Sequence, residues 1–153
     1  MKKILTLAIV AILCIGAFTG CKKSDSGSSY SMKATVAGSA FNVSNVYATI
    51  TSNTLAITGN SGSSTTTQSP PYLSVVLYDY TNTGNYTIDT TASTPTVAAT
   101  YAPDATITDW KTSYTGSVTI SSVTSTQVVG TFNFVMADGS TITGGTFTAK
   151  RIN

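Results

Sequence analysis

Residues 130–149 read GTFNFVMADGSTITGGTFTA, and this stretch decides the fold class. Phenylalanine and methionine alternate with other residues from 132 to 136, which is the two-residue period of a half-buried β-strand. The Asp138-Gly139 pair that follows is the strongest turn signal in the chain. The stretch therefore predicts an antiparallel β-hairpin.

The register of this hairpin depends on its loop. A three-residue loop with Gly139 in the left-handed region would place Met136 opposite Ile142 and Phe134 opposite Gly144. An aromatic ring over a cross-strand glycine is a common packing solution, and the second glycine of the Gly144 pair would form a β-bulge. The bulge would then place four apolar side chains on one face: Phe132, Phe134, Met136 and Phe147.

Short segments with the same period recur upstream, separated by turn residues. We expect strands near residues 32–36, 46–51, 55–57, 72–80, 84–89, 116–120 and 128–136. Residues 60–71 contain no apolar side chain before two prolines and predict a loop, and residues 90–98 predict an irregular segment. About eight to ten strands with no helix after the leader predict an all-β fold, either an antiparallel sandwich or a flattened barrel.

The start of the chain predicts export and lipid attachment. Two lysines precede an apolar run over residues 4–18, which at ~1.5 Å per residue is too short to cross ~30 Å of hydrocarbon. Such a run is typical of a cleaved signal peptide. Cys21 follows the small residue Gly20, as lipoprotein cleavage requires, whereas Cys14 follows the bulky Leu13. We expect cleavage after Gly20 and acylation of Cys21.

This leader divides the chain into three parts. Residues 1–20 are the expected lipoprotein signal peptide, residues 21–30 a lipidated Ser/Gly-rich tether, and residues 31–153 a single β domain. The expected partner is the lipid bilayer, through acylated Cys21, because two or more acyl chains hold a protein firmly. The expected location is a cell envelope.

Composition excludes several kinds of chemistry. The chain has no histidine and no glutamate, and processing leaves no free cysteine, so a Ser-His-Asp site and a Cys/His zinc site are excluded. Loss of the leader leaves six basic residues against six aspartates, a balance that does not suit nucleic acid. Two aspartates can carry out glycoside hydrolysis, and Asp104 and Asp109 lie near each other in the sequence. Aspartates in turns, however, usually bond the local backbone. We expect no enzyme, no metal and no cofactor.

Aromatic side chains are the candidate ligand-binding residues. Tyr72, Tyr78 and Tyr80 fall on one face of the predicted strand 72–80, and Trp110 follows a Pro-Asp loop, four residues before Tyr114. An exposed row of rings could stack on sugar rings and bind a glycan, whereas the alternative is packing between sheets.

Several short motifs together resemble a family of uncharacterised Bacteroidota lipoproteins. They are ATVAGSAF at 34–41, GNYTI at 84–88, GSVTI at 116–120, GTFNF at 130–134, and GTF at 145–147 after the Asp138-Gly139 turn. The resemblance covers most of residues 31–149 and comes without any known activity. It implies lipid anchoring in the outer membrane of a cell envelope, on either the periplasmic or the outer face. Asp89-Thr90-Thr91 also resembles the O-glycosylation motif of envelope proteins in that phylum, with Thr90 as the possible acceptor.

Three functions remain open from the sequence. The first is a non-enzymatic envelope lipoprotein with a binding or structural role, whose partner could be an envelope component. The second is a glycan-binding module that uses exposed tyrosine and tryptophan. The third is a lipocalin-like carrier, which requires a closed barrel with an empty apolar interior.

Overall fold

The computed structural model describes residues 30–66, 69–91, 96–105 and 110–152, and these residues form strands and no helix. The ten strands are β1 (Ser31–Val36), β2 (Ser39–Val43), β3 (Asn45–Thr51), β4 (Thr54–Asn60), β5 (Tyr72–Leu77), β6 (Gly84–Thr87), β7 (Val97–Ala102), β8 (Lys111–Val123), β9 (Gln127–Met136) and β10 (Thr141–Ile152). The predicted all-β class is confirmed. Within the described residues, no helix is long and apolar enough to span a membrane.

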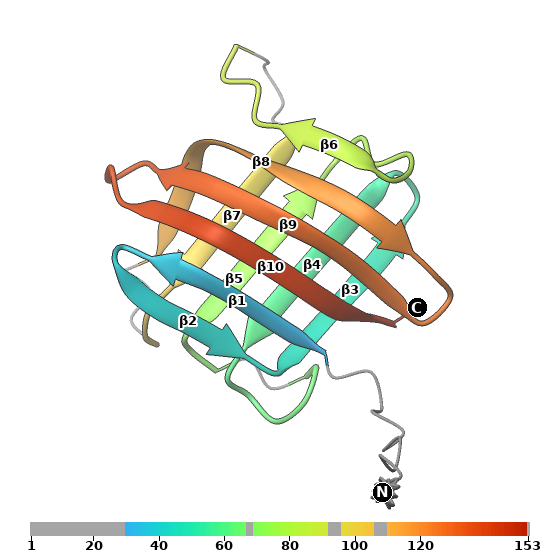
Figure 1. The fold of residues 1–153 in the computed structure, drawn as a ribbon, viewed down its shortest axis with the longest axis horizontal. Coiled ribbons are helices and arrows are strands. Elements are labelled where there is room, and N and C mark those ends of the chain that lie inside the picture. The colour runs from blue at the N-terminus through green and yellow to red at the C-terminus, as the bar shows by residue number, and fades with distance from the viewer. Residues whose placement is uncertain (1–29, 67–68, 92–95, 106–109, 153) are drawn as a thin grey trace, which may run out of the picture.

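The strands form two layers that cross at a steep angle (Figure 1). The front layer has the order β6-β8-β9-β10-β1-β2, and the back layer has the order β3-β4-β5-β7. The end of β10 pairs with β3 at one corner, and β7 pairs with the start of β8 at another. These two corners close a ring of seven strands, so the fold is a flattened barrel with β1, β2 and β6 added to the front layer.

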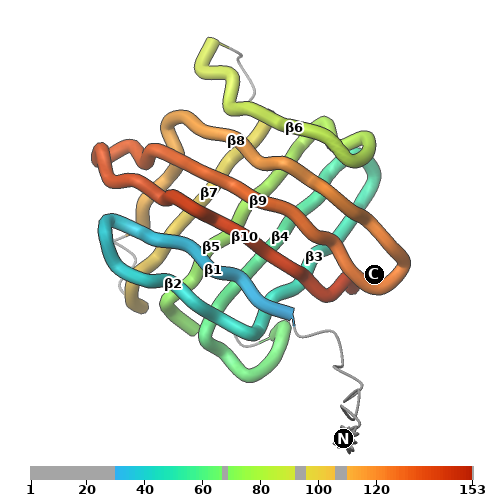
Figure 2. The backbone as a smooth tube through the Cα atoms, viewed as in Figure 1, coloured from blue at the N-terminus to red at the C-terminus, as the bar shows by residue number. Residues whose placement is uncertain are grey.

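β8 passes from one layer to the other. The backbone tube shows this strand running beside β7 and then turning across the front of the molecule (Figure 2). The pairing between β8 and β9 shifts register between Ser113 and Thr115. An extra residue in one strand bends that strand and increases its twist, so this bulge lets a single strand serve both layers.

The hairpin of β9 and β10 follows the sequence prediction in its turn and differs in its register. Gly139 is left-handed, with φ of 83°, and the Asp138 Oδ1 atom accepts the Ser140 N–H at 3.0 Å. Pairing resumes at once, because Met136 N–H donates to Ser140 O at 2.8 Å. Phe134 therefore lies opposite Ile142, and the predicted pairings of Met136 with Ile142 and of Phe134 with Gly144 are wrong by two residues. An even shift leaves each side chain on its predicted face.

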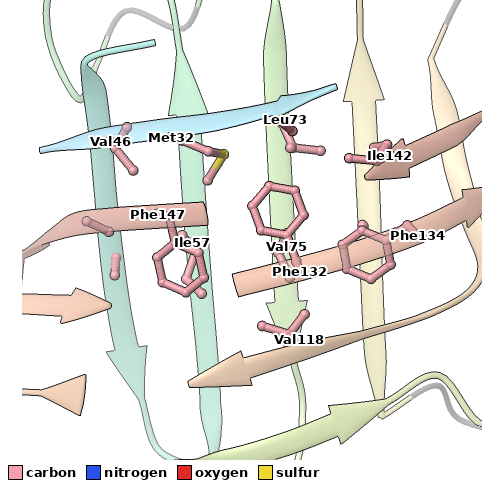
Figure 3. Close-up of a cluster of buried hydrophobic side chains, with 14 of the residues drawn as sticks. Met32, Val46, Ile57, Leu73, Val75, Val118, Phe132, Phe134, Ile142 and Phe147 are labelled. Carbon is pink, nitrogen blue, oxygen red and sulfur yellow. The ribbon is translucent and has the colours of Figure 1, made fainter. Parts of the chain in front are cut away.

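The bulge at Gly144 is confirmed, and so is the shared face. Gly144 has φ of 61°, and the β9–β10 register shifts between Ile142 and Gly145. Phe132, Phe134, Met136 and Phe147 are all buried. The three phenylalanine side chains project into the space between the layers (Figure 3).

Each of these phenylalanines lies over a glycine of the neighbouring strand. The pairs are Phe132 with Gly145, Phe134 with Gly116, and Phe147 with Gly130. A Cβ atom added to Gly145 would lie 2.4 Å from Phe132 Cδ2, which is far inside van der Waals contact. The rings therefore occupy the volume that side chains would need at these glycines, and they brace β8, β9 and β10 against one another.

The back layer supplies the aliphatic half of the core. Leu73, Val75 and Leu77 of β5 are fully buried, as their alternation predicted, and β4 adds Leu55 and Ile57. All five belong to the buried core cluster, and Leu73, Val75 and Ile57 project into the space between the layers (Figure 3). The described residues thus pack a core between the layers, whereas the carrier hypothesis requires an empty apolar interior.

Several elements differ from the sequence expectations. β2 was not expected, because Ser39 and Asn42 dilute its apolar pattern. Asn60 belongs to β4 and is fully buried, although the sequence placed it in a loop. β5 ends at Leu77 and not at Tyr80, and β7 begins at Val97, inside the segment expected to be irregular.

The glycine–phenylalanine contacts give a direct prediction. Gly145→Ala should lower the free energy of unfolding by about 1–3 kcal/mol, because the new methyl group overlaps the Phe132 ring. Chemical denaturation of the full chain measures this loss. The matched control is Thr146→Ala, at the exposed neighbouring position, where a change within about 0.5 kcal/mol is expected. Equal losses in the two variants would contradict the packing argument.

Candidate functional site

Tyr72 and Trp110 form a stacked aromatic pair on the outside of the barrel. Their ring centroids are 6.0 Å apart and their planes differ by 23°. Tyr72 begins β5 and is half-buried, whereas Trp110 immediately precedes β8 and is 51% exposed. One tryptophan face is thus supported by a second ring while the side chain stays open to solvent.

A hollow of about 200 Å³ lies beside this pair. Its walls come from the chain before β5, the end of β7 with the segment after it, and the residue before β8. The lining residues are Ser69, Pro70, Tyr72, Ala102, Asp104, Ala105 and Trp110. Aromatic and small apolar surface predominates, with a hydroxyl and a carboxylate as polar groups, which is a common composition for a small-molecule site.

The wall that contains Ser69 and Pro70 is held by hydrogen bonds to Ser61. Ser61 N–H donates to Ser69 O at 3.0 Å, and Ser61 Oγ donates to Ser69 O at 3.1 Å and to Pro70 O. These bonds join the two ends of the β4–β5 connection, so the wall stands in a defined place beside Tyr72.

The start of the same connection is held by the buried side-chain amide of Asn60. Asn60 Oδ1 accepts Asn45 Nδ2 at 2.9 Å and Gly62 N–H at 2.8 Å, and Asn45 Nδ2 also donates to Ser64 O at 2.8 Å. Asn60 pairs with Tyr72 across β4 and β5. This amide network therefore fixes the backbone next to the aromatic pair, which explains why a polar residue is buried here.

An ion pair fixes the strand that follows Trp110. Lys111 Nζ donates to Asp138 Oδ2, and Ala137 N–H donates to Thr112 O at 2.8 Å. The Lys111 ammonium and the Ser140 donors hold the pKa of the Asp138 carboxyl well below its usual range. The start of β8 is thereby tied to the β9–β10 turn, and Trp110 is carried on a braced backbone.

The predicted tyrosine row does not form. Tyr78 and Tyr80 lie beyond the end of β5, where the chain bends, so the alternation that put them beside Tyr72 no longer applies. Tyr78 is 42% exposed, but six residues at ~3.3 Å each place it at the other end of the strand. Tyr80 is buried against Tyr86, with ring centroids 6.0 Å apart, and burial raises the pKa of its hydroxyl.

Tyr114 is a further exposed ring, four residues after Trp110 in the sequence. It occupies the β8 bulge, between Ser113 and Thr115, and is 63% exposed. A bulge turns one side chain out of the strand's alternation. The sequence placed Tyr114 near Trp110, but the bulge that exposes it has no clear signal in a run of threonine and serine.

The start of β8, which follows Trp110, and the start of β1 lie at opposite ends of the front layer. Ala37 N–H donates to Thr141 O at 2.8 Å, so the β1–β2 turn adjoins the β9–β10 turn that holds the start of β8. Ser31, at the other end of β1, lies opposite Thr148. In Figure 1 the chain enters β1 on the right, whereas β8 starts on the left. Tyr72 belongs to the back layer, and its neighbour Leu73 pairs with Gly59, against which Met32 of β1 packs.

Other predicted site residues are separate from this hollow. Thr90 is exposed in the turn after β6, and Asp89 Oδ1 accepts the Thr91 N–H at 2.8 Å, so glycosylation there stays a prediction. Across the described ranges, no three potential ligand residues gather where they could hold a metal ion. Cys21, Gly20, the signal peptide, most of the tether and Asp109 lie outside the described residues.

The residues that form the walls of the hollow were not singled out from the sequence. Ser69, Pro70, Ala102 and Ala105 carry no chemical signal of their own. Asp104 was weighed with Asp109 as a carboxylate pair and interpreted as a turn aspartate. Their juxtaposition depends on which strands pair, which the sequence pattern does not determine.

Comparison with known proteins gives one match. The family model described as Domain of unknown function (DUF6252) matches residues 28–149. Neither the curated proteins nor the solved structures contain a match.

The Asp138 carboxyl gives a pH prediction. Its depressed pKa stabilises the fold above the ordinary carboxyl pKa, and this contribution is lost as the pH falls below that value toward the folded pKa. Asp138→Asn should therefore lower the melting temperature at neutral pH, and the difference from the parent chain should shrink as the pH drops below about 4. Thermal melts over a pH series measure it. A difference that grows in acid would contradict the assignment, and Thr115→Ala serves as an exposed control.

Proposed function

The chain belongs to this family of unknown function, and from its geometry we propose that it is a lipid-anchored envelope protein that binds a carbohydrate without transforming it. The observation that carries the proposal is the Trp110 ring, stacked on Tyr72 and exposed at the rim of a hollow. An aromatic face is a flat apolar surface with negative charge density. It suits the C–H face of a sugar ring, whose carbons carry partly positive hydrogens.

The polar groups around the hollow favour a neutral sugar. Ser69 and Asp104 lie in its lining, and among the described lining residues there is no lysine or arginine. Lys111 is next to Trp110 in the chain, but its ammonium binds Asp138. The Asp104 carboxylate would repel an anionic ligand, whereas sugar hydroxyls can donate to the carboxylate and to Ser69.

The absence of histidine from the sequence supports binding over catalysis. Among the described residues of the hollow's lining, Asp104 is the one titratable group apart from Tyr72. Glycoside hydrolysis ordinarily uses a pair of carboxylates on either side of the scissile bond. We therefore propose that the ligand leaves the site unchanged.

The proposed lipid anchor at Cys21 is compatible with carbohydrate binding in a cell envelope. The leader and Cys21 favour lipid attachment at the chain's start. We propose the outer membrane as the location, in keeping with the lipoproteins that the sequence motifs resemble.

The proposal is tested with the protein's own fluorescence. Trp110 is the one tryptophan in the chain, so its emission reports the site without a label. Titration of the full chain in detergent with soluble neutral polysaccharides, such as glucans, mannans and xylans, should shift this emission with at least one of them. In a pull-down on that polysaccharide, Trp110→Ala should weaken binding by roughly 10-fold or more, as loss of a central aromatic contact does.

The matched control for that experiment is Tyr78→Ala. Tyr78 is an exposed aromatic at the other end of β5, so its loss should leave binding unchanged. Trp110→Phe should retain most of the binding, because a ring remains for stacking. Equal binding by Trp110→Ala and the parent chain would overturn the site, and no response to any neutral polysaccharide would overturn the ligand class.

The anchor has its own test. Cys21→Ala should abolish incorporation of labelled fatty acid into the protein and move it from the membrane to the soluble fraction. Cys14→Ala is the control, because this residue lies in the segment expected to be removed, and it should change neither readout. Labelled fatty acid in the Cys21→Ala protein would contradict the assignment of the anchor.

A further inference from the structure

The outer edge of β2 is an unpaired sheet edge. β2 is the last strand of the front layer, and it lies at the lower border of that layer in Figure 1. Among the described residues, its only backbone ladder is with β1. A strand edge with free N–H and C=O groups is a template for another strand.

The pairing with β1 determines which groups point outward. Ala37 and Gly38 both have positive φ, 48° and 82°, as in a two-residue hairpin turn that closes on Val36 and Ser39. Pairs alternate between bonded and non-bonded along an antiparallel ladder. Ser39, Phe41 and Val43 therefore bond to β1, and Ala40 and Asn42 direct their N–H and C=O groups outward.

The opposite edge of the same layer receives a bond from outside its ladder. β6 is the last strand there, and Thr96 Oγ1 donates to Thr87 O at 2.8 Å. Among the described residues, no side chain makes a comparable bond to the backbone of β2.

β2 also lacks the residues that usually prevent strand pairing at an exposed edge. Its sequence, SAFNV, contains no lysine, no other charge and no proline, which are the residues that ordinarily block edge pairing. Ala40 and Asn42 are exposed and small, and Phe41 and Val43 are buried. The edge is therefore sterically and electrostatically open to a second strand.

We propose that β2 pairs with β2 of a second copy of this chain, antiparallel, with Ala40 opposite Asn42 of the other copy. In this register the two outward residues of each copy bond only to each other, so every outward N–H on both strands has an acceptor. The arrangement is two-fold symmetric, as most homodimer contacts are. The two front layers become one continuous sheet.

The charges near the edge are compatible with this register. Lys33 of β1 lies beside Asn42, and Thr35 lies beside Ala40. Pairing Asn42 with Ala40 of the other copy puts Lys33 in the same row as Thr35 of that copy, so the two lysines do not face each other. A heterologous strand would need its own matching charges, whereas a second copy supplies this complementarity by symmetry.

Few hydrogen bonds join the two copies, so the contact is weak in dilute solution. The lipid anchor proposed above would confine both copies to one membrane surface. Such confinement raises their effective concentration and strengthens weak contacts. The association should therefore be sought where the protein resides and not in dilute extracts.

The test is cross-linking of the full chain in the cells that express it. Asn42→Cys places a thiol on each strand, in diagonal positions about 7–8 Å apart in this register. A short bifunctional maleimide should give several-fold more cross-linked dimer than with Asn85→Cys. That control has an exposed thiol on β6, at the opposite edge. The parent chain, without an added cysteine, should give none.

A second variant separates pairing from mere proximity. Ala40→Pro removes one outward donor and no bond to β1, a position where an edge strand tolerates proline. Added to Asn42→Cys, it should reduce the dimer to the Asn85→Cys level with the melting temperature nearly unchanged. The proposal is overturned if Asn42→Cys yields no more dimer than Asn85→Cys, if Ala40→Pro leaves the yield intact, or if the product joins the chain to a different protein.

Discussion

The contact on which the rest of the structure depends is the packing of phenylalanine rings over glycines in β8, β9 and β10. Phe132, Phe134 and Phe147 fill space that no side chain occupies at Gly145, Gly116 and Gly130. This packing joins three long strands into a curved sheet whose ends reach β3 and β7. Without that curvature the two layers could not close, and the start of β8, which follows Trp110, would have no fixed place.

The sequence predicts local features of this fold better than pairings between distant segments. The Asp138-Gly139 turn and the shared face of the phenylalanines follow from turn chemistry and a two-residue period. The register does not, because shifting a hairpin by two residues preserves the face of every side chain. The strand end at Leu77 was also missed, since the apolar pattern continues to Tyr80 while the backbone bends.

In the candidate site too, the sequence predicts individual residues better than the way in which they come together. Trp110 and Tyr72 were singled out as aromatics, but they are 38 residues apart in the sequence and meet only because β7 pairs with both β5 and β8. Asn60 and Ser61 hold the neighbouring wall through bonds that depend on the β3–β4–β5 register. A row of tyrosines was expected, and a stacked pair beside a hollow is found, which is the arrangement on which the proposed carbohydrate binding rests.

The central claim is that the aromatic pair is open to solvent and stays so when the proposed lipid anchor holds the chain on a bilayer. The direct test is quenching of Trp110 fluorescence in the lipidated chain reconstituted into vesicles. An aqueous quencher such as acrylamide should quench the emission efficiently, and brominated lipids should leave it unchanged. Strong quenching by brominated lipid would place Trp110 at the bilayer and contradict the account.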